Sequence, residues 1–178
     1  DEEYYNIKGK SITKSLMKTP INGAPLSSGF GRRVHPVLGY TKMHKGIDFA
    51  AKKGTPIYAA GDGKVERSNR YGGYGNYIRI RHNSDYQTAY AHLSKFASNI
   101  RVGVRVKQKD IIGYVGSTGR STGPHLHYEI IFRGKQVNPK TLNLPKGKRI
   151  LEKEIENFRN NKKSILLRLK KLSNKYIN

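Results

Sequence analysis

The sequence predicts an antiparallel all-β domain, a sandwich or barrel, followed by an amphipathic helix. Two observations predict the β domain: short strand candidates with turn signals between them follow one another from residue 40 to residue 140, and no convincing helix interrupts this stretch. A four-three spacing of apolar residues near the C-terminus predicts the helix. The 178 residues give room for one domain with a substantial core plus appendages.

The composition excludes several kinds of site. There are no cysteines, so disulfides and thiolate metal sites are excluded, and any metal must be held by histidine and carboxylate. No run approaches the roughly twenty apolar residues of a membrane-spanning helix. The chain begins at Asp1, without a methionine or a charged and apolar leader, so we expect a processed or truncated piece of a longer protein.

The formal net charge of +23 favours polyanionic surroundings, such as nucleic acid, anionic lipid or acidic envelope polymers. The basic residues are spread along the chain, and no zinc finger, recognition helix or RNA-binding sheet motif accompanies them. We therefore expect no specific nucleic-acid partner. The charge indicates polyanionic surroundings and does not identify a particular partner.

The N-terminal segment alternates loosely around a Lys8-Gly9-Lys10 turn, which suggests two short strands within residues 4–18. We assign residues 1–19 to a β-ribbon that is the remnant or the edge of an upstream domain. Further along, proline, glycine and serine predict loops and short strands up to about Gly39. His35 precedes Pro36 and so prefers extended backbone, and we expect it to support a site rather than to bind metal.

The main domain is predicted to contain a series of short strands. The candidates are residues 55–60, 63–67, 76–82, 87–92 and 110–115. His82 ends one of these strands, and we expect it to be structural because no second feature accompanies it.

A further strand is predicted over residues 125–132, His-Leu-His-Tyr-Glu-Ile-Ile-Phe. Its period of two puts His125, His127 and Glu129 on one face. Imidazole is the commonest metal ligand, so two imidazoles that point the same way are candidate ligands. Histidines in strands are also often ordinary hydrogen-bonded residues, and the pair alone is a weak signal.

A second motif, His44-Lys45-Gly46-Ile47-Asp48, strengthens the metal-site hypothesis. An imidazole and a carboxylate four residues apart point to the same side of the backbone. Catalytic zinc takes three protein ligands and keeps one position open. His44, Asp48 and one histidine of the downstream pair complete such a set, and spacing alone does not say which histidine it is.

His92 ends another strand candidate. It is either a strand-end histidine bonded to backbone or, beside a metal, the neutral base and donor that amide hydrolysis requires. The glycine-rich loop 116–123 lacks a Walker lysine and leads into a strand, so it is not a phosphate cradle. We expect it to form the wall of a groove in which an extended peptide lies close to the backbone.

Taken together, these segments resemble the lysostaphin and LytM-type zinc metallopeptidases of bacterial cell walls. The resemblance rests on His44-x-x-x-Asp48, on Ala91-His92-Leu93-Ser94 and on residues 119–129, and it covers about residues 20–145, which we assign to the peptidase domain. It implies a LytM-type β-sandwich of the duplicated-hybrid-motif kind. It also implies one zinc ion per chain bound by His44, Asp48 and His127, with His92 and His125 as uncharged catalytic histidines.

The resemblance further implies that the peptide stems of peptidoglycan are the substrate. The run ending Asn138-Pro139 and the segment from Tyr4 to Pro20 are similar to murein D,D-endopeptidases of Gram-negative envelopes. We therefore favour hydrolysis of D-alanyl-diaminopimelate bridges in the periplasm, during wall growth or remodelling. The alternatives are a glycyl-glycine endopeptidase, a non-catalytic LytM-type amidase activator, which typically lacks ligands, and a basic binding module.

Residues 146–178 are predicted to form a basic amphipathic helix. They contain 11 basic and 3 acidic residues, a net charge of +8. The apolar stripe, broken only by Lys162, comprises Leu151, Ile155, Phe158, Lys162, Ile165, Leu169, Leu172 and Tyr176. The helix either packs on its own domain or a partner helix, or lies on an anionic membrane surface. The sequence does not predict an oligomeric state.

Overall fold

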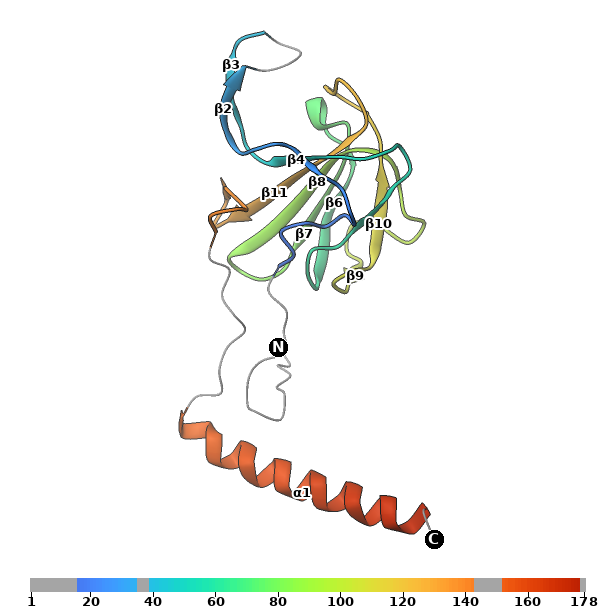
Figure 1. The fold of residues 1–178 in the computed structure, drawn as a ribbon, viewed down its shortest axis with the longest axis vertical. Helices are drawn as coiled ribbons and strands as arrows, with labels where there is room; N and C mark the ends of the chain where they lie inside the picture. Colours follow the sequence, from blue (N-terminus) through green and yellow to red (C-terminus); the bar gives the residue numbers. More distant parts are fainter. Residues whose placement is uncertain (1–15, 35–38, 143–151, 177–178) are drawn as a thin grey trace. The chain divides into compact units, whose positions relative to one another are not determined.

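The computed structural model describes residues 16–34, 39–142 and 152–176 (Figure 1). The described strands belong to one compact unit and the helix belongs to another, and each unit is treated by itself. The division into residues 1–19, 20–145 and 146–178 stays a prediction, and the strands expected at residues 4–15 lie outside the described residues. No helix of the described part is long and apolar enough to cross a membrane.

The described chain is built from short strands, with one 3-10 turn, η1 (Gly72–Tyr74), and one helix, α1 (Glu152–Tyr176). The strands are β1 (Leu26–Ser28), β2 (Gly31–Val34), β3 (Thr41–His44), β4 (Ile47–Ala50), β5 (Pro56–Tyr58), β6 (Gly63–Arg70), β7 (Asn76–Arg81), β8 (Tyr86–Phe96), β9 (Arg105–Val106), β10 (Ile111–Val115), β11 (His125–Phe132) and β12 (Lys135–Val137). All six strands predicted between residues 55 and 132 are present. The strand around His92 is longer than predicted and continues to Phe96.

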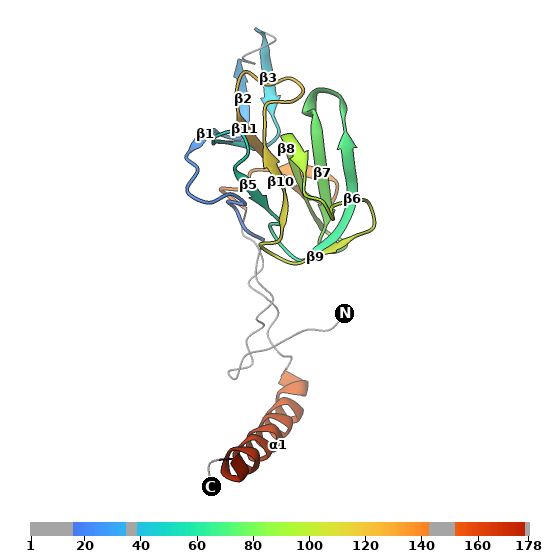
Figure 2. The same cartoon turned by 90° about the vertical axis from the view of Figure 1, so that its right-hand side faces the viewer.

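The strands pair antiparallel throughout the described part, which confirms the predicted fold class (Figures 1 and 2). The main sheet runs in the order β1-β4-β11-β8-β7-β6-β9. Strand β10 pairs with β5 and with the C-terminal end of β8, and β12 pairs with β11. Strands β2 and β3 form a separate hairpin. Strand β11 therefore lies between β4 and β8, where it is held on both edges.

The two faces of β11 carry different kinds of side chain. Leu126, Tyr128 and Ile130 are fully buried in the main core, where the Tyr128 ring lies 5.4 Å from that of Tyr90. Each fully buried apolar side chain contributes roughly 1.5–3 kcal/mol. The alternating residues of β11 point to the opposite face, as the period of two predicts. The core thus fixes a strand whose other side carries the polar residues.

The predicted C-terminal helix is present as α1, and its apolar side chains from Ile165 to Leu172 are exposed, whereas Ile155 and Phe158 are half-buried. Ile165, Leu169 and Leu172 of the predicted stripe are each more than half exposed. Since exposed apolar surface on a basic helix costs free energy in water, this stripe is a candidate contact surface.

Candidate functional site

Pairing of β4 with β11 brings the predicted ligands together. Asp48 and His127 are register partners across these two strands, and His44 ends β3 just before β4. Gly46 makes the connection, and a Cβ atom there would lie 2.5 Å from the Tyr128 carbonyl oxygen and 2.7 Å from the His127 ring. Only glycine therefore lets the chain pass so close to His127.

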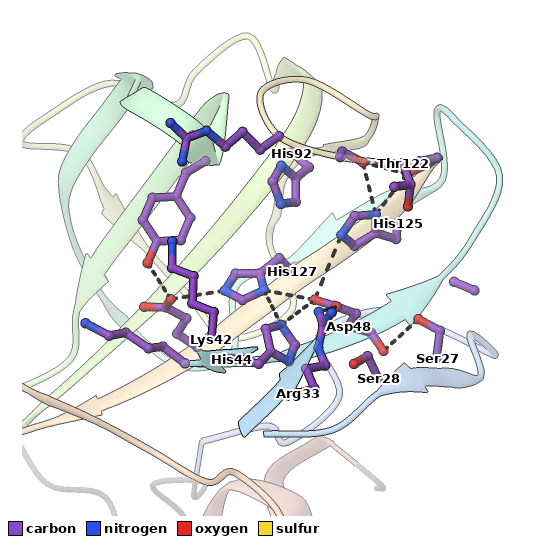
Figure 3. Close-up of a pocket in the computed structure, with 18 of the residues that line it drawn as sticks. Ser27, Ser28, Arg33, Lys42, His44, Asp48, His92, Thr122, His125 and His127 are labelled. Carbon is purple, nitrogen blue, oxygen red and sulfur yellow. Dashed lines mark hydrogen bonds and ion pairs between the residues drawn. The ribbon is translucent and has the colours of Figure 1, made fainter. Parts of the chain in front are cut away.

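The three side chains converge on one point (Figure 3). The Nδ1 atom of His127 lies 2.8 Å from Oδ1 of Asp48 and 3.0 Å from Nε2 of His44, and the latter two atoms are 3.1 Å apart. Asp48 and His127 are buried. Three such atoms, gathered in a buried place, are a donor set for a cation.

The outward-facing atom of each side chain is held by a separate partner. The Nδ1–H of His44 donates to the Gly29 carbonyl at 2.6 Å, and the Nε2–H of His127 donates to Glu129 at 3.0 Å. The Arg33 guanidinium donates to Oδ2 of Asp48 at 3.2 Å. These partners select the tautomers that direct lone pairs toward the centre. Two imidazole nitrogens and one carboxylate oxygen fit a catalytic zinc site.

The electrostatics of the centre favour positive charge. Burial alone would lower the pKa of His127, but hydrogen bonds to Asp48 and Glu129 raise it to about 9. Burial alone would raise the pKa of Asp48, but hydrogen bonds from His127 and His44 hold it well below its usual range. A place that stabilises a proton between two ligands also suits a metal cation, which displaces that proton.

Glu129 and Arg33 are functional candidates that the sequence analysis missed. Glu129 is buried and accepts hydrogen bonds from the Tyr74 hydroxyl at 2.8 Å and from Gln136 at 3.3 Å, besides the one from His127. The alternation His-x-His-x-Glu placed it on the correct face and was the available signal. Arg33 had no comparable signal, because the β2–β3 hairpin brings it to Asp48.

His92 and His125 form a second pair beside the metal centre. Their ring centroids are 4.8 Å apart, and Nε2 of His125 lies 3.9 Å from Oδ1 of Asp48. The Nδ1–H of His92 donates to the Thr118 carbonyl at 2.7 Å, and that of His125 donates to the Gly123 carbonyl at 2.8 Å. Each ring therefore keeps Nε2 as its acceptor. Burial lowers the pKa of His92 to about 4, so this ring is neutral at pH 7.

A β-bulge aims His92 at the site. Strand β8 places one extra residue between the pairs Ile78–Tyr90 and Asn76–Leu93, and His92 has a φ of 62°. Tyr90 and Leu93 both enter the main core, so regular alternation would have sent His92 into the core as well. The bulge instead keeps it on the face that carries His127. A left-handed residue costs about 1–2 kcal/mol, which the sheet pairing on both sides offsets.

A groove of about 660 Å³ surrounds the metal centre and the histidine pair. The glycine-rich loop forms one wall through Arg120, Ser121, Thr122 and Gly123, as predicted. Other polar lining residues are Ser27, Ser28, Arg33, Lys42, Lys45 and Tyr74. An open groove with backbone at its wall suits an extended peptide.

The remaining histidines lie elsewhere or outside the described residues. His82 does not line the groove; its Nδ1–H donates to the Asp62 carbonyl at 2.7 Å, and its Nε2 accepts from the Thr88 hydroxyl at 2.8 Å. These two hydrogen bonds agree with the expected structural role of His82. His35 lies outside the described residues.

A largely buried set of two histidines and one aspartate beside two further histidines, on an antiparallel sheet, defines a site of the metallopeptidase class. The chain belongs to peptidase family M23, whose model matches residues 42–139. The resemblance to LytM-type and lysostaphin-like zinc peptidases is thereby confirmed.

Among curated proteins, the chain is 43% identical to the peptidoglycan DD-endopeptidase ShyC of Vibrio cholerae over 171 residues, 96% of this chain and 39% of that protein. It is 49% identical to the DD-carboxypeptidase/endopeptidase Mpg of Neisseria meningitidis over 129 residues, 71% of this chain and 29% of that protein. The chain thus spans about two fifths or less of the length of these relatives.

Two solved structures have similar folds. A zinc containing peptidase from Vibrio cholerae superposes with a TM-score of 0.69 at 39% identity, over 82% of this chain and 45% of that one. The catalytic domain of lysostaphin from Staphylococcus simulans superposes with a TM-score of 0.60 at 34% identity, over 67% of this chain and 91% of that one. The second comparison covers nearly the whole of a catalytic domain.

Proposed function

We propose that this chain is a zinc-dependent endopeptidase that hydrolyses peptide crosslinks of peptidoglycan, namely D-alanyl-diaminopimelate bridges, in wall growth or remodelling. One observation carries the proposal: the ligand atoms of His44, Asp48 and His127 lie within 4.8 Å of one another, beside the pair of His92 and His125. The choice of substrate is supported by the similarity to ShyC, a peptidoglycan DD-endopeptidase, and to Mpg, a DD-carboxypeptidase/endopeptidase.

In this proposal His44, Asp48 and His127 hold one zinc ion per chain. Bound zinc polarises a carbonyl group and lowers the pKa of a water molecule to about 7. Glu129 and Arg33 orient two of the ligands, because each holds the atom that faces away from the centre. These hydrogen bonds support the proposed ligand set, because they hold Asp48 and His127 in the orientation that a bound ion requires.

His92 and His125 move the protons of the reaction. Hydrolysis of the amide requires that the attacking water lose a proton and that the leaving nitrogen gain one. The Nδ1–H of each ring is bonded to a backbone carbonyl, so Nε2 accepts the proton and then donates it to the leaving amine. Positioned groups of this kind contribute about 10²–10⁴-fold in rate.

The groove accounts for substrate binding. An extended peptide can lie along the wall at residues 120–123, where hydroxyl and backbone groups are available for hydrogen bonds. Peptide stems of peptidoglycan are the proposed partner, and the envelope, specifically the periplasm, is the proposed location.

Digestion of crosslinked murein by the zinc-loaded chain tests the proposal. Mass spectrometry of the released fragments should show crosslinked dimers converted to monomers by cleavage between D-alanine and diaminopimelate. A chelator should abolish the reaction, and zinc should restore it. Cleavage of glycine bridges instead would support the glycyl-glycine alternative. No cleavage, together with stimulation of an amidase, would support the activator alternative, against which the complete ligand set argues.

The exposed stripe of α1 supports a separate proposal, that this helix lies on an anionic lipid surface. Basic residues flank the stripe, and Ile165, Leu169 and Leu172 are exposed. The chain should sediment with anionic but not with neutral lipid vesicles. Leu169→Glu should abolish this binding, whereas Leu167→Glu, away from the stripe, should retain most of it. Equal sedimentation with both vesicles would refute the dependence on anionic lipid, and sedimentation with neither would favour packing against protein.

A further inference from the structure

The groove is unevenly charged. Its acidic residues are Asp48 and Glu129, and both are buried and already hydrogen-bonded within the metal centre. Lys42, Lys45 and Arg120 line the same groove. Among the described residues, no carboxylate lies within ion-pair distance of Lys42 or Arg120. The groove therefore has positive charge that its own residues do not neutralise.

Lys42 lies at one end of the groove. Figure 3 shows Lys42 on the side of His127 that faces away from Asp48, with Ser27 and Thr122 on the far side of the centre. On the same side as Lys42, Nε2 of His127 meets Glu129 and Tyr74.

Arg120 is held at this end by η1. Its backbone N–H donates to the Gly73 carbonyl at 2.8 Å, and its side chain lies along Gly73, where a Cβ atom would be 3.3 Å from Cδ. Gly73 directly precedes Tyr74, whose ring lies 5.7 Å from that of His127. Arg120 is thus anchored by its backbone while its guanidinium stays exposed. The other end of the groove has hydroxyl groups from Ser27, Ser28 and Thr122.

We propose that Lys42 and Arg120 form a binding site for the free carboxylate that neighbours the scissile amide. This inference rests on the proposed function. In a D-alanyl-diaminopimelate bridge, the carbon that carries the scissile nitrogen also carries a free carboxylate. An internal glycyl-glycine bond has no such group. Charge-assisted hydrogen bonds from lysine and arginine recognise a carboxylate, so this end of the groove selects crosslinks whose leaving amine is an amino acid with a free carboxylate.

Two synthetic crosslinked dimers test the site. They differ only in whether the group beside the scissile nitrogen is a carboxylate or a carboxamide, and kcat/KM is measured for each with the zinc-loaded chain. The wild type should prefer the carboxylate by about tenfold or more, as expected for hydrogen bonds to a charged group. In a Lys42→Met, Arg120→Met double variant the ratio should fall to near one.

Matched controls separate this site from general charge effects. A Lys53→Met, Arg101→Met double variant removes two exposed cations that do not line the groove, and it should keep the wild-type ratio. Lys42→Arg should also keep most of it. Equal cleavage of both dimers by the wild type would overturn the proposal, and so would a preference that survives the groove double variant.

A binding measurement distinguishes this inference from the proposed function. Calorimetry with the zinc-loaded His125→Ala variant, in which turnover is expected to be strongly reduced, gives the affinity for both dimers. Carboxylate-selective binding without hydrolysis by the wild type would refute the endopeptidase and leave the carboxylate site standing. Equal affinity for both dimers would refute the site, whichever bond is cut.

Discussion

Asp48 and His127 face each other as register partners across β4 and β11, with Nδ1 of His127 2.8 Å from Oδ1 of Asp48. The metal centre is therefore part of the strand pairing. A one-residue slip would turn one of these side chains to the opposite face of the sheet. The buried side chains that fix β11 in the core thus also fix the distance between two ligands.

The two histidines of the His-x-His pair should behave differently when replaced. His127→Ala should lose zinc and activity together, because it removes an atom of the converging set. His125→Ala should retain zinc and lose about 10²–10⁴-fold in turnover, because its Nε2 lies beside the centre and is one of the two proposed proton carriers. Atomic absorption measures the zinc content of each variant, and cleavage of crosslinked dimers measures its turnover. Full activity with normal zinc in either variant would contradict the assignment.

Glu129→Gln should weaken zinc binding by about tenfold or more, because it removes the negative charge that supports the His127 ring. Competition with a chromogenic chelator measures this affinity. Glu66→Gln is the matched control, since Glu66 is bonded to Arg79 and Arg81 outside the groove. If the two variants bind zinc equally well, Glu129 has no special role in the site.

Gly46→Ala should lower both zinc affinity and stability. The added methyl group would collide with the Tyr128 carbonyl and the His127 ring, and overpacking of this kind costs about 1–3 kcal/mol. Gly29→Ala serves as the stability control, because a Cβ atom at Gly29 meets nothing within 4 Å. Thermal unfolding of the metal-free proteins compares them. The same midpoint for Gly46→Ala and wild type would show that the strand connection can relax.

His82 should reduce the stability of the fold on acidification. Burial lowers the pKa of His82 in the folded state, so the unfolded chain binds this proton more readily. The contribution of neutral His82 to the free energy of unfolding is therefore present above the unfolded pKa of about 6.5. It is lost as the pH falls below that value, by at most about 1.4 kcal/mol per pH unit. Urea unfolding with chelator at pH 7.5 and 5.5 should show a smaller pH effect for His82→Gln than for wild type. An unchanged pH effect would contradict this.

The sequence predicted those parts of the site that depend on local geometry. Alternation along residues 125–132 placed His125, His127 and Glu129 on one face, and the spacing from His44 to Asp48 predicted a shared side. The choice between the two histidines depends on strand register, which is non-local: Asp48 pairs with His127, whereas His125 pairs with Ala50. Residue spacing therefore left that choice open, and only the family resemblance made it.

Two further features depend on long-range structure in the same way. His92 reaches the site through a bulge that forms between paired strands, and its residue type gives no sign of a left-handed backbone. Arg33 reaches Asp48 from the β2–β3 hairpin, whose residues line part of the groove. Neither contact produces a repeating residue pattern that could have been recognised in the sequence.

The backbone carbonyls that orient His92 and His125 belong to one loop, at Thr118 and Gly123. The ligands of the metal centre have their own supports at Gly29, Arg33 and Glu129. In the proposed mechanism, displacing that loop would misorient both proton carriers at once and leave the three metal ligands in place. A partner or a neighbouring segment that moved this one loop would therefore stop the proposed reaction. Return of the loop would restore it without any need to bind the metal again.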